Sequence, residues 1–320
     1  MAINADKPLL WKNDIAKSVD FYNNWFMNFA PKTYRETRLE TTKQVVEALK
    51  LTQYLVDIDS KKLAQNPQIL SILRMVTAPP IARDRLIGLA SVSSNLVKNM
   101  ELNTRIPPKM DKNKLESELT KIGKIIGKLI DKDLFPWLDN DNSPDEESLN
   151  RASTIVADRL CGAVSDPIIR NAQERRQLEA IKSWLDARGY HYAKSLEINN
   201  FKNMKNGTYS FRLNIPVKLE DGSKSVNIPV DAVIKPHNSK LEDFPLLFEA
   251  KSAGDFTNTN KRRKEEALKI AQLRNNYGNK IKFILFLCGY FDSGYLGYEA
   301  AEGIDWIWEH KIDDMSKLGL

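Results

Sequence analysis

The sequence contains few of the residues on which several common kinds of site depend. Its 320 residues include two cysteines and three histidines, and these do not cluster. Cys161 and Cys288 sit among apolar neighbours, without a CxxC pair or a histidine at metal-ligand spacing, so we interpret both as reduced core residues. No serine lies in a nucleophile-elbow pattern and no glycine loop could cradle a phosphate. These absences argue against zinc and acyl-enzyme mechanisms.

Long apolar runs are also missing. The first ten residues lack the basic start and apolar run that export requires, and no later stretch approaches the ~18 apolar residues of a membrane span. We therefore expect a globular, cytoplasmic protein with no membrane partner. Basic residues outnumber acidic ones by 48 to 42, for a net charge of +6. This excess favours a polyanionic partner, but many basic proteins bind no nucleic acid, so local features must decide.

The chain has two halves with different patterns. From Asp14 to about Asp166, apolar residues return at three- and four-residue spacing, which predicts helix after helix. Prolines are predicted to break these helices at Pro31, Pro67, Pro79-Pro80 and Pro107-Pro108. The segment "KLESELTKIGKIIGKLIDKDLF" carries lysines opposite its apolar stripe, and a solvated face is favoured over a DNA-tracking one. We predict an all-helical domain over residues 1–166, whose role is DNA recognition, dimerisation or both.

After Pro167 the pattern changes to an α/β order. A strong helix, "IIRNAQERRQLEAIKSWLDARGY", precedes two β-rich runs, which Asp221-Gly222 is predicted to join as a hairpin turn. "FPLLFEAK" follows as a third strand, and a helix that stops at Gly278 leads into the buried strand "KIKFILFLCGY". We therefore predict a C-terminal domain over residues 167–320 with a central mixed sheet flanked by helices. The fold class is α+β or α/β.

Three polar residues stand out on the predicted strands. Strand alternation turns Asp231 away from the apolar residues of "VNIPVDAVIKP", and it places Glu249 and Lys251 on one face of "LLFEAK". If these strands are neighbours, the three side chains converge, and a hard divalent cation suits the two carboxylates. Mg²⁺ held by Asp231 and Glu249 would favour phosphodiester hydrolysis, with Lys251 orienting or deprotonating water or stabilising negative charge. The alternative is a structural ion pair, with Asp231 capping a turn.

A further acidic residue comes from the helix that precedes the strands. At 100° per residue, Glu174 falls on the core-facing stripe of Leu178, Ile181 and Leu185, whereas Glu179 points to the opposite side. We therefore include Glu174 in the predicted catalytic set. The competing interpretation is an N-terminal carboxylate that the helix dipole stabilises.

These segments resemble a known superfamily. "IPVDAVIKP" followed by "PLLFEAKS" resembles the PD-(D/E)XK nuclease signature, although Val230 separates Pro229 from Asp231. More narrowly, "IIRNAQERRQLEAIKSWLDARGY" with "FEAKSAGDFTNTNKRRKEEA" resembles the XamI-like type II restriction endonucleases. The resemblance implies a restriction-endonuclease-like fold and Mg²⁺-dependent cleavage of double-stranded DNA at a short palindrome.

A polar and basic segment follows the catalytic triplet directly. Asn258 and Asn260 lead into a helix start with three basic residues, which are Lys261, Arg262 and Arg263. Such residues contact phosphates, and Asn and Arg can also read base edges in the major groove. Basic residues oppose the dipole at a helix start, which points to an external reason for the cluster. The alternative is a solvated first turn that Glu265 and Glu266 partly neutralise.

The predicted function is a type II restriction endonuclease that acts as a homodimer, because a two-fold protein matches a two-fold DNA site. A cognate methyltransferase is expected as a neighbouring gene rather than as a stable partner. The alternatives are a repair or structure-specific nuclease of the same fold and a DNA-binding protein without catalysis.

Overall fold

The computed structural model describes residues 2–139, 143–198, 200–218, 225–240, 242–257 and 259–320, without the side chains of 163–166 and 259–262. The predicted turn at Asp221-Gly222 lies outside these residues. The chain forms two compact units, which are residues 1–29 with 169–320 (unit 1) and residues 30–168 (unit 2). This division differs from the predicted one in assigning residues 1–29 to the unit that holds the sheet. Within the described residues, no helix is both long and apolar enough to cross a membrane.

Two long helices contain the boundaries between the units. Helix α1 (Pro8–Leu51) includes Pro31, and helix α7 (Glu146–Asp186) includes Pro167. The predicted break at Pro31 is therefore wrong, and the predicted change of pattern after Pro167 falls inside a continuous helix. A proline removes one backbone hydrogen bond and crowds one carbonyl, but the turns on either side keep their own bonds, so a long helix can continue. Both prolines nevertheless lie within two residues of a unit boundary.

Unit 2 is helical. Between its parts of α1 and α7 it contains five shorter α-helices, which are α2 (Ser60–Gln65), α3 (Leu70–Met75), α4 (Arg83–Ala90), α5 (Ser94–Asn103) and α6 (Lys112–Leu129). Their apolar stripes form one core, in which Leu70, Leu86 and Ile122 are fully buried. The predicted helical N-terminal part is confirmed.

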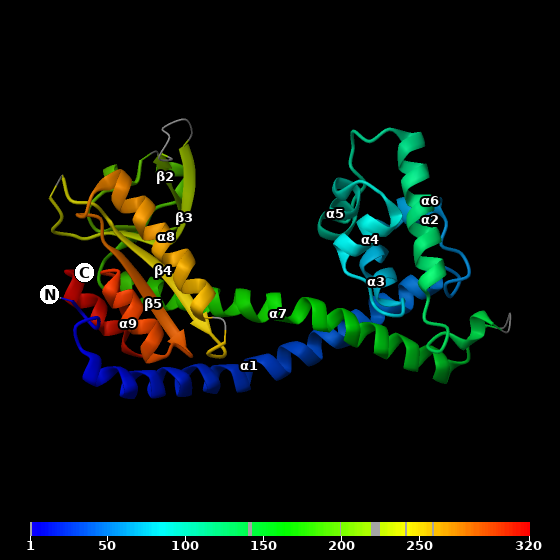
Figure 1. The fold of residues 1–320 in the computed structure, drawn as a ribbon, viewed down its shortest axis with the longest axis horizontal. Coiled ribbons are helices and arrows are strands. Elements are labelled where there is room, and N and C mark those ends of the chain that lie inside the picture. Colours follow the sequence, from blue (N-terminus) through cyan, green and yellow to red (C-terminus); the bar gives the residue numbers. More distant parts are fainter. Residues whose placement is uncertain (1, 140–142, 199, 219–224, 241, 258) are drawn as a thin grey trace. The chain divides into compact units, whose positions relative to one another are not determined.

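Unit 1 is built on a six-stranded mixed sheet in the order β1-β2-β3-β4-β5-β6 (Figure 1). Its strands are β1 (His191–Tyr192), β2 (Thr208–Lys218), β3 (Ser225–Lys235), β4 (Leu246–Ala253), β5 (Phe283–Gly289) and β6 (Asp305–Trp308). The β2-β3 and β3-β4 pairs are antiparallel, whereas the β1-β2, β4-β5 and β5-β6 pairs are parallel. The predicted mixed sheet with flanking helices is confirmed.

Helices cover both faces of the sheet. Ile181 and Leu185 of α7 pack with Phe248 and Phe286 on one face, which the 3₁₀ segment η5 (Glu309–Leu318) also covers. On the other face, α8 (Thr259–Tyr277) and α9 (Ser293–Ala301) pack against strand residues that include Leu247. The predicted stop of α8 is confirmed, because the helix ends at Tyr277 and Gly278 has a φ of +77°.

The first residues of the chain belong to unit 1 because they bond to its last strand. The Asp305 carboxylate accepts hydrogen bonds from the backbone N–H groups of Ile3, Asn4 and Ala5. Trp11 packs edge-on against Trp306, with the ring centroids 5.5 Å apart. Trp306 is fully buried. These contacts join residues that are about 300 positions apart in the sequence.

Candidate active site

The two strands that carry the predicted catalytic residues separate where those residues lie. The antiparallel β3-β4 ladder ends at the pair Ala232 and Phe248, and Asp231 and Glu249 would form the next pair in the same register. Instead of a ladder bond, the backbone N–H of Ala250 donates to Oδ2 of Asp231 at 2.8 Å. The two carboxylates therefore lie at a gap between neighbouring strands, where a ligand can enter.

Two lysines hold one oxygen of Glu249. The Nζ of Lys251 lies 3.1 Å from Oε1 of Glu249, and the Nζ of Lys269 on α8 lies 2.7 Å from the same oxygen. The other oxygen, Oε2, is buried and has no hydrogen-bond partner among the residues that the structure describes. A buried carboxylate oxygen without a partner costs free energy, so this oxygen is available to a cation.

A second buried carboxylate supports Lys251 from α8. Oε1 of Glu266 lies 3.6 Å from the Nζ of Lys251, and Oε2 accepts a 2.6 Å hydrogen bond from the Tyr295 hydroxyl. Burial alone would lower the pKa of Lys251, but the charges of Glu249 and Glu266 outweigh it and raise that pKa. Lys251 is therefore a cation at neutral pH.

Glu266 also contacts Glu299 of α9. Burial, followed by the charge of Glu266, raises the pKa of Glu299 to about 8. The Glu299 carboxyl group is therefore mostly protonated at neutral pH and adds little negative charge beside Glu266.

The environment of Asp231 resists its ionisation. Burial is the main cause and the charge of Glu249 is the second, and together they raise the pKa of Asp231 to about 6, although the bond from Ala250 acts in the opposite direction. The carboxylate is therefore ionised at neutral pH only at an electrostatic cost. A bound cation would remove that cost.

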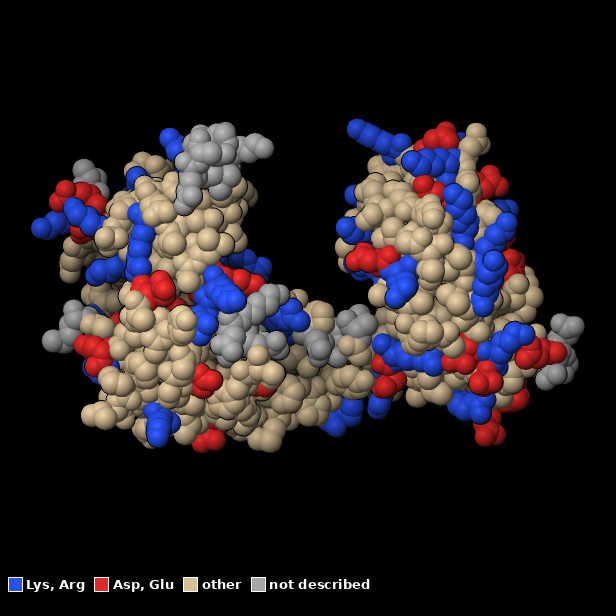
Figure 2. All heavy atoms as spheres, in the orientation of Figure 1, with Lys and Arg blue, Asp and Glu red and all other residues tan. Residues whose placement is uncertain are grey.

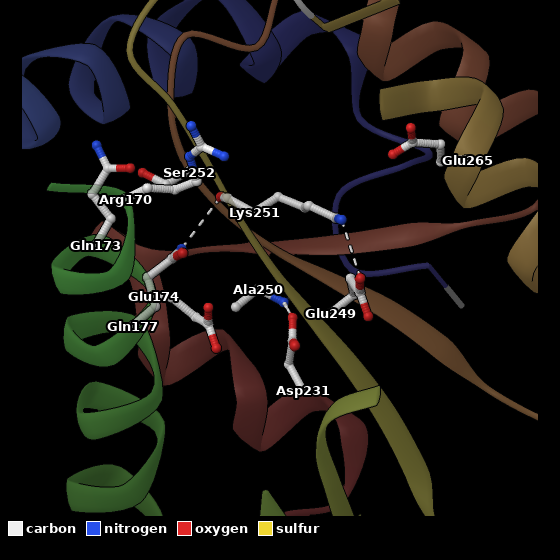
Figure 3. A pocket seen from close by; sticks show the side chains of 10 residues that line it. All are labelled: Arg170, Gln173, Glu174, Gln177, Asp231, Glu249, Ala250, Lys251, Ser252 and Glu265. Atoms are coloured by element: carbon white, nitrogen blue, oxygen red, sulfur yellow. Dashed lines mark hydrogen bonds and ion pairs between the residues drawn. The ribbon is translucent and has the colours of Figure 1, made fainter. Parts of the chain in front are cut away.

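Helix α7 forms the opposite wall of the pocket, which has a volume of about 670 Å³ (Figure 3). Gln177 is buried and donates from Nε2 to the backbone carbonyls of Lys251 and Phe286, so it fixes α7 against β4 and β5. Glu174 lines the pocket together with Asp231, Glu249 and Lys251. Because α7 begins at Glu146, Glu174 lies in the middle of the helix, and its interpretation as an N-terminal, dipole-stabilised carboxylate is wrong.

The predicted DNA-binding residues are only partly described. Asn258 lies outside the described residues, and the side chains of Asn260, Lys261 and Arg262, in the first turns of α8, are likewise not described. The Cζ of Arg263 lies 3.4 Å from the centroid of the Tyr298 ring. Arg263 is therefore stacked on α9 rather than fully solvated.

Sequence reasoning missed Glu266, Lys269 and Gln177. Glu266 entered the sequence analysis only in the alternative of a solvated first turn, but it is 1% exposed and faces Lys251. The signal was present, because Glu266 occupies the same helical stripe as the buried Ile270 and Leu273. Gln177 similarly precedes the core residue Ile181 by one turn. A polar residue on an apolar stripe indicates a buried polar partner.

The donor set suits a hard cation that arrives with its substrate. Among the described residues, no three His, Cys, Asp or Glu side chains form a preformed metal site. Mg²⁺ does not require one, because it binds through one or two carboxylates and keeps water and substrate phosphate as its other ligands. Asp231 and the unpaired Oε2 of Glu249 fit that requirement.

The chain is similar to known proteins over most of its length. The family model described as XamI restriction endonuclease matches residues 53–308. "Type II restriction enzyme SalI" of Streptomyces albus G is 52% identical over 320 residues, which cover 99% of each chain. The structure of protein VC1899 from Vibrio cholerae aligns with 80% of this chain and 55% of its own at 13% identity, with a TM-score of only 0.29. The resemblance predicted from the sequence is thus confirmed, and the chain belongs to the XamI family of restriction endonucleases.

Proposed function

We propose that this restriction endonuclease is a type II enzyme that hydrolyses both strands of double-stranded DNA at a short palindrome through a PD-(D/E)XK centre. The observation that carries the proposal is the gap between β3 and β4, where Asp231 and Glu249 meet beside Lys251. A backbone phosphate that enters this gap would reach two carboxylates and one ammonium group together.

In this proposal Asp231 and Glu249 bind Mg²⁺. The ion supplies Lewis-acid polarisation of the phosphate and lowers the pKa of a bound water. The buried Oε2 of Glu249 then gains a partner, while Oε1 keeps its ion pairs with Lys251 and Lys269. The N–H of Ala250 fixes the carboxylate of Asp231 toward the same gap.

Lys251 lies beside the proposed metal ligand Glu249, and in the metal-free protein the charges of Glu249 and Glu266 raise its pKa, so it carries a proton there. A protonated amine beside the phosphate stabilises the negative charge that develops during hydrolysis and orients the attacking water. Glu174, on the opposite wall, is the fourth member of the proposed site.

Contacts with the DNA backbone extend beyond the pocket. The start of α8, with Asn258, Asn260, Lys261, Arg262 and Arg263, follows β4 and is our proposed DNA-binding segment. In unit 2, whose proposed role is recognition or dimerisation, lysines gather over α6, where Lys114, Lys121, Lys124 and Lys128 share one stripe (Figure 2). Such a stripe could contact phosphates without reading sequence, although a solvated face remains the favoured interpretation of these lysines.

A plasmid digest tests the proposed function. In Mg²⁺ the protein should give discrete bands, and these should vanish in EDTA and with Asp231→Ala. A smear would indicate a repair or structure-specific nuclease, and tight binding without cleavage in Mg²⁺ or Mn²⁺ would indicate a DNA-binding protein. Sequencing the ends of the fragments would give the recognition site and the cut positions.

We further propose a cytoplasmic homodimer, in which each subunit cuts one strand of a two-fold site. Sedimentation of the protein with and without cleaved DNA measures its oligomeric state. A methyltransferase gene beside this one is expected, because a lone sequence-specific nuclease would damage its host. A monomer with a single active site would contradict the dimer proposal.

A further inference from the structure

Strand β2 contains a backbone kink beside the proposed active site. Arg212 has a φ of +51°, a left-handed conformation that is uncommon for residues other than glycine. The kink reverses which face of the sheet alternate side chains of β2 occupy. Before it, Tyr209 belongs to the core on the α7 side of the sheet, and after it, Leu213 and Ile215 belong to the core on the α8 side.

The kink lies directly across from Asp231. In the β2-β3 ladder, Phe211 pairs with Ala232 and Leu213 pairs with Val230, so Arg212 and Asp231 are opposite one another. Opposed residues of an antiparallel pair place their side chains on the same face, about 5 Å apart. In a regular strand the Arg212 and Asp231 side chains would therefore lie on one face. With the left-handed backbone, the Arg212 guanidinium pairs with another carboxylate.

Arg212 instead bonds to Glu174 on α7. Its Nη2 and Nε lie 2.7 and 3.2 Å from Oε1 of Glu174. The Arg212 side chain is 69% exposed, and an ion pair so open to solvent contributes little to folding. The contact with Glu174 does not itself explain the disfavoured backbone conformation, and such conformations gather at functional sites.

We propose that Arg212 is a substrate-binding residue that exchanges partners. In the DNA-free protein its guanidinium rests on Glu174, and when DNA binds, it moves to a phosphate oxygen next to the scissile bond. The planar guanidinium fits a phosphate through paired hydrogen bonds. The exchange leaves the Glu174 carboxylate facing the pocket, and the kink keeps the arginine away from Asp231 throughout. This inference rests on the proposed function.

The salt dependence of DNA binding tests the exchange. The probe is a labelled duplex that spans a cleavage site mapped by end sequencing, and anisotropy is recorded in EDTA over a series of NaCl concentrations. Arg212→Gly removes the charge while glycine retains the positive φ. The slope of log K against log salt should become less negative by about 0.9, the value for one lost phosphate contact.

Glu174→Gln provides the opposite change. Without the Glu174 carboxylate, Arg212 has no ion pair to give up when DNA binds. The affinity for DNA should therefore rise about 2- to 5-fold, which corresponds to the free energy of one exposed ion pair. The double variant should bind like Arg212→Gly. Arg212→Lys should keep the slope. Arg188→Ala is the matched control, because Arg188 pairs with Asp313 at 3.2 Å without lining the pocket, and its slope should equal that of the wild type.

Two results would overturn the inference. One is a wild-type slope for Arg212→Gly, and the other is equal weakening by Arg212→Gly and Glu174→Gln, which a purely structural ion pair predicts. Cleavage by Asp231→Ala would overturn the proposed catalytic centre instead. The binding slopes are measured without cleavage, so the two failures can be told apart.

Discussion

The two units bury carboxylates in opposite ways. In unit 2, the Glu101 side chain is 2% exposed, and both of its oxygens are bonded: Arg74 reaches them through Nε and Nη2, and Arg83 donates from Nε at 2.7 Å. In unit 1, the Glu249 side chain is 6% exposed, but Oε2 has no hydrogen-bond partner. Similar burial therefore accompanies a completed ion pair in one unit and an incomplete one in the other.

This difference in hydrogen bonding indicates different roles for the carboxylates of Glu101 and Glu249. A fully bonded buried ion pair holds neighbouring elements in place, and removing one member is costly. An incompletely bonded carboxylate lowers stability and keeps a position open for a ligand, which is the usual compromise at active sites. The Glu101 ion pairs thus fix the shape of unit 2, whereas Oε2 of Glu249 in unit 1 stays open to the cation that we propose.

The largest expected effect is on catalysis in unit 1. Glu249→Gln keeps the shape of the side chain but removes a metal-binding charge, which is worth several kcal/mol in the transition state. Single-turnover cleavage should therefore slow by about 10³-fold or more. Glu101→Gln, in unit 2, should cleave at the wild-type rate per folded molecule. If the Glu249→Gln variant cleaved DNA at a rate within tenfold of the wild type, the contrast between Glu249 and Glu101 would not hold.

The next largest effect is on the stability of unit 2. Glu101→Gln leaves the buried Arg74 without its counter-charge, which should reduce the free energy of unfolding by about 3 kcal/mol. Urea unfolding followed by circular dichroism measures this change. Glu116→Gln, at an exposed position on α6, serves as the control and should stay within about 0.5 kcal/mol of the wild type. Equal stabilities for the two variants would show that Glu101 is not structural.

Asp231→Asn should stabilise unit 1 in metal-free buffer. The pKa of Asp231 is raised from 3.8 to about 6, so the folded protein binds the proton more tightly than the unfolded chain. The contribution of Asp231 to the free energy of unfolding is complete below about pH 4 and is lost as the pH rises through about 6. The variant cannot ionise, so at pH 7 it should exceed the wild type by about 1–3 kcal/mol.

Denaturant unfolding in EDTA at pH 4 and pH 7 measures this difference, which should vanish at pH 4. Asp133→Asn, at an exposed position of unit 2, should show no such pH dependence. Added Mg²⁺ should stabilise the wild type and leave Asp231→Asn unchanged. A variant less stable than the wild type at pH 7 would contradict an electrostatic cost at Asp231.

The smallest of these effects concerns Glu266 as a positioning residue. Glu266→Gln removes an anion from Lys251, which should slow cleavage by about 10- to 100-fold, the usual cost of losing a supporting contact. It should also move the alkaline limb of the pH-rate profile to lower pH, because the pKa of Lys251 falls. Glu179→Gln, exposed on α7, should change neither. A slower enzyme with an unshifted profile would mean that Glu266 supports only the fold.

The convergence of Asp231, Glu249 and Lys251 could be predicted because it depends on the two-residue period of strands and on the pairing of neighbouring strands. Glu174 followed from the period of a helix. The buried state of Glu266 was missed because charge was taken as a sign of exposure, whereas the position of Glu266 on an apolar stripe decides its environment.

Other features depend on contacts that local patterns do not contain. Nothing in "SFRLN" indicates that Arg212 adopts a positive φ, because arginine has no preference for that conformation. Pro31 and Pro167 are strong local signals for a break, but packing of the long helices outweighs them. The placement of residues 1–29 in unit 1 depends on bonds to Asp305, far away in the sequence.

Those bonds have a consequence for the order in which the protein is made. During translation, unit 2 leaves the ribosome as one continuous segment, whereas unit 1 needs both the first residues and strand β6 before it can fold. We therefore expect the helical unit to fold during translation, while the sheet waits for strand β6. A nascent chain would then lack a complete sheet, and with it the proposed active site, until strand β6 has left the ribosome.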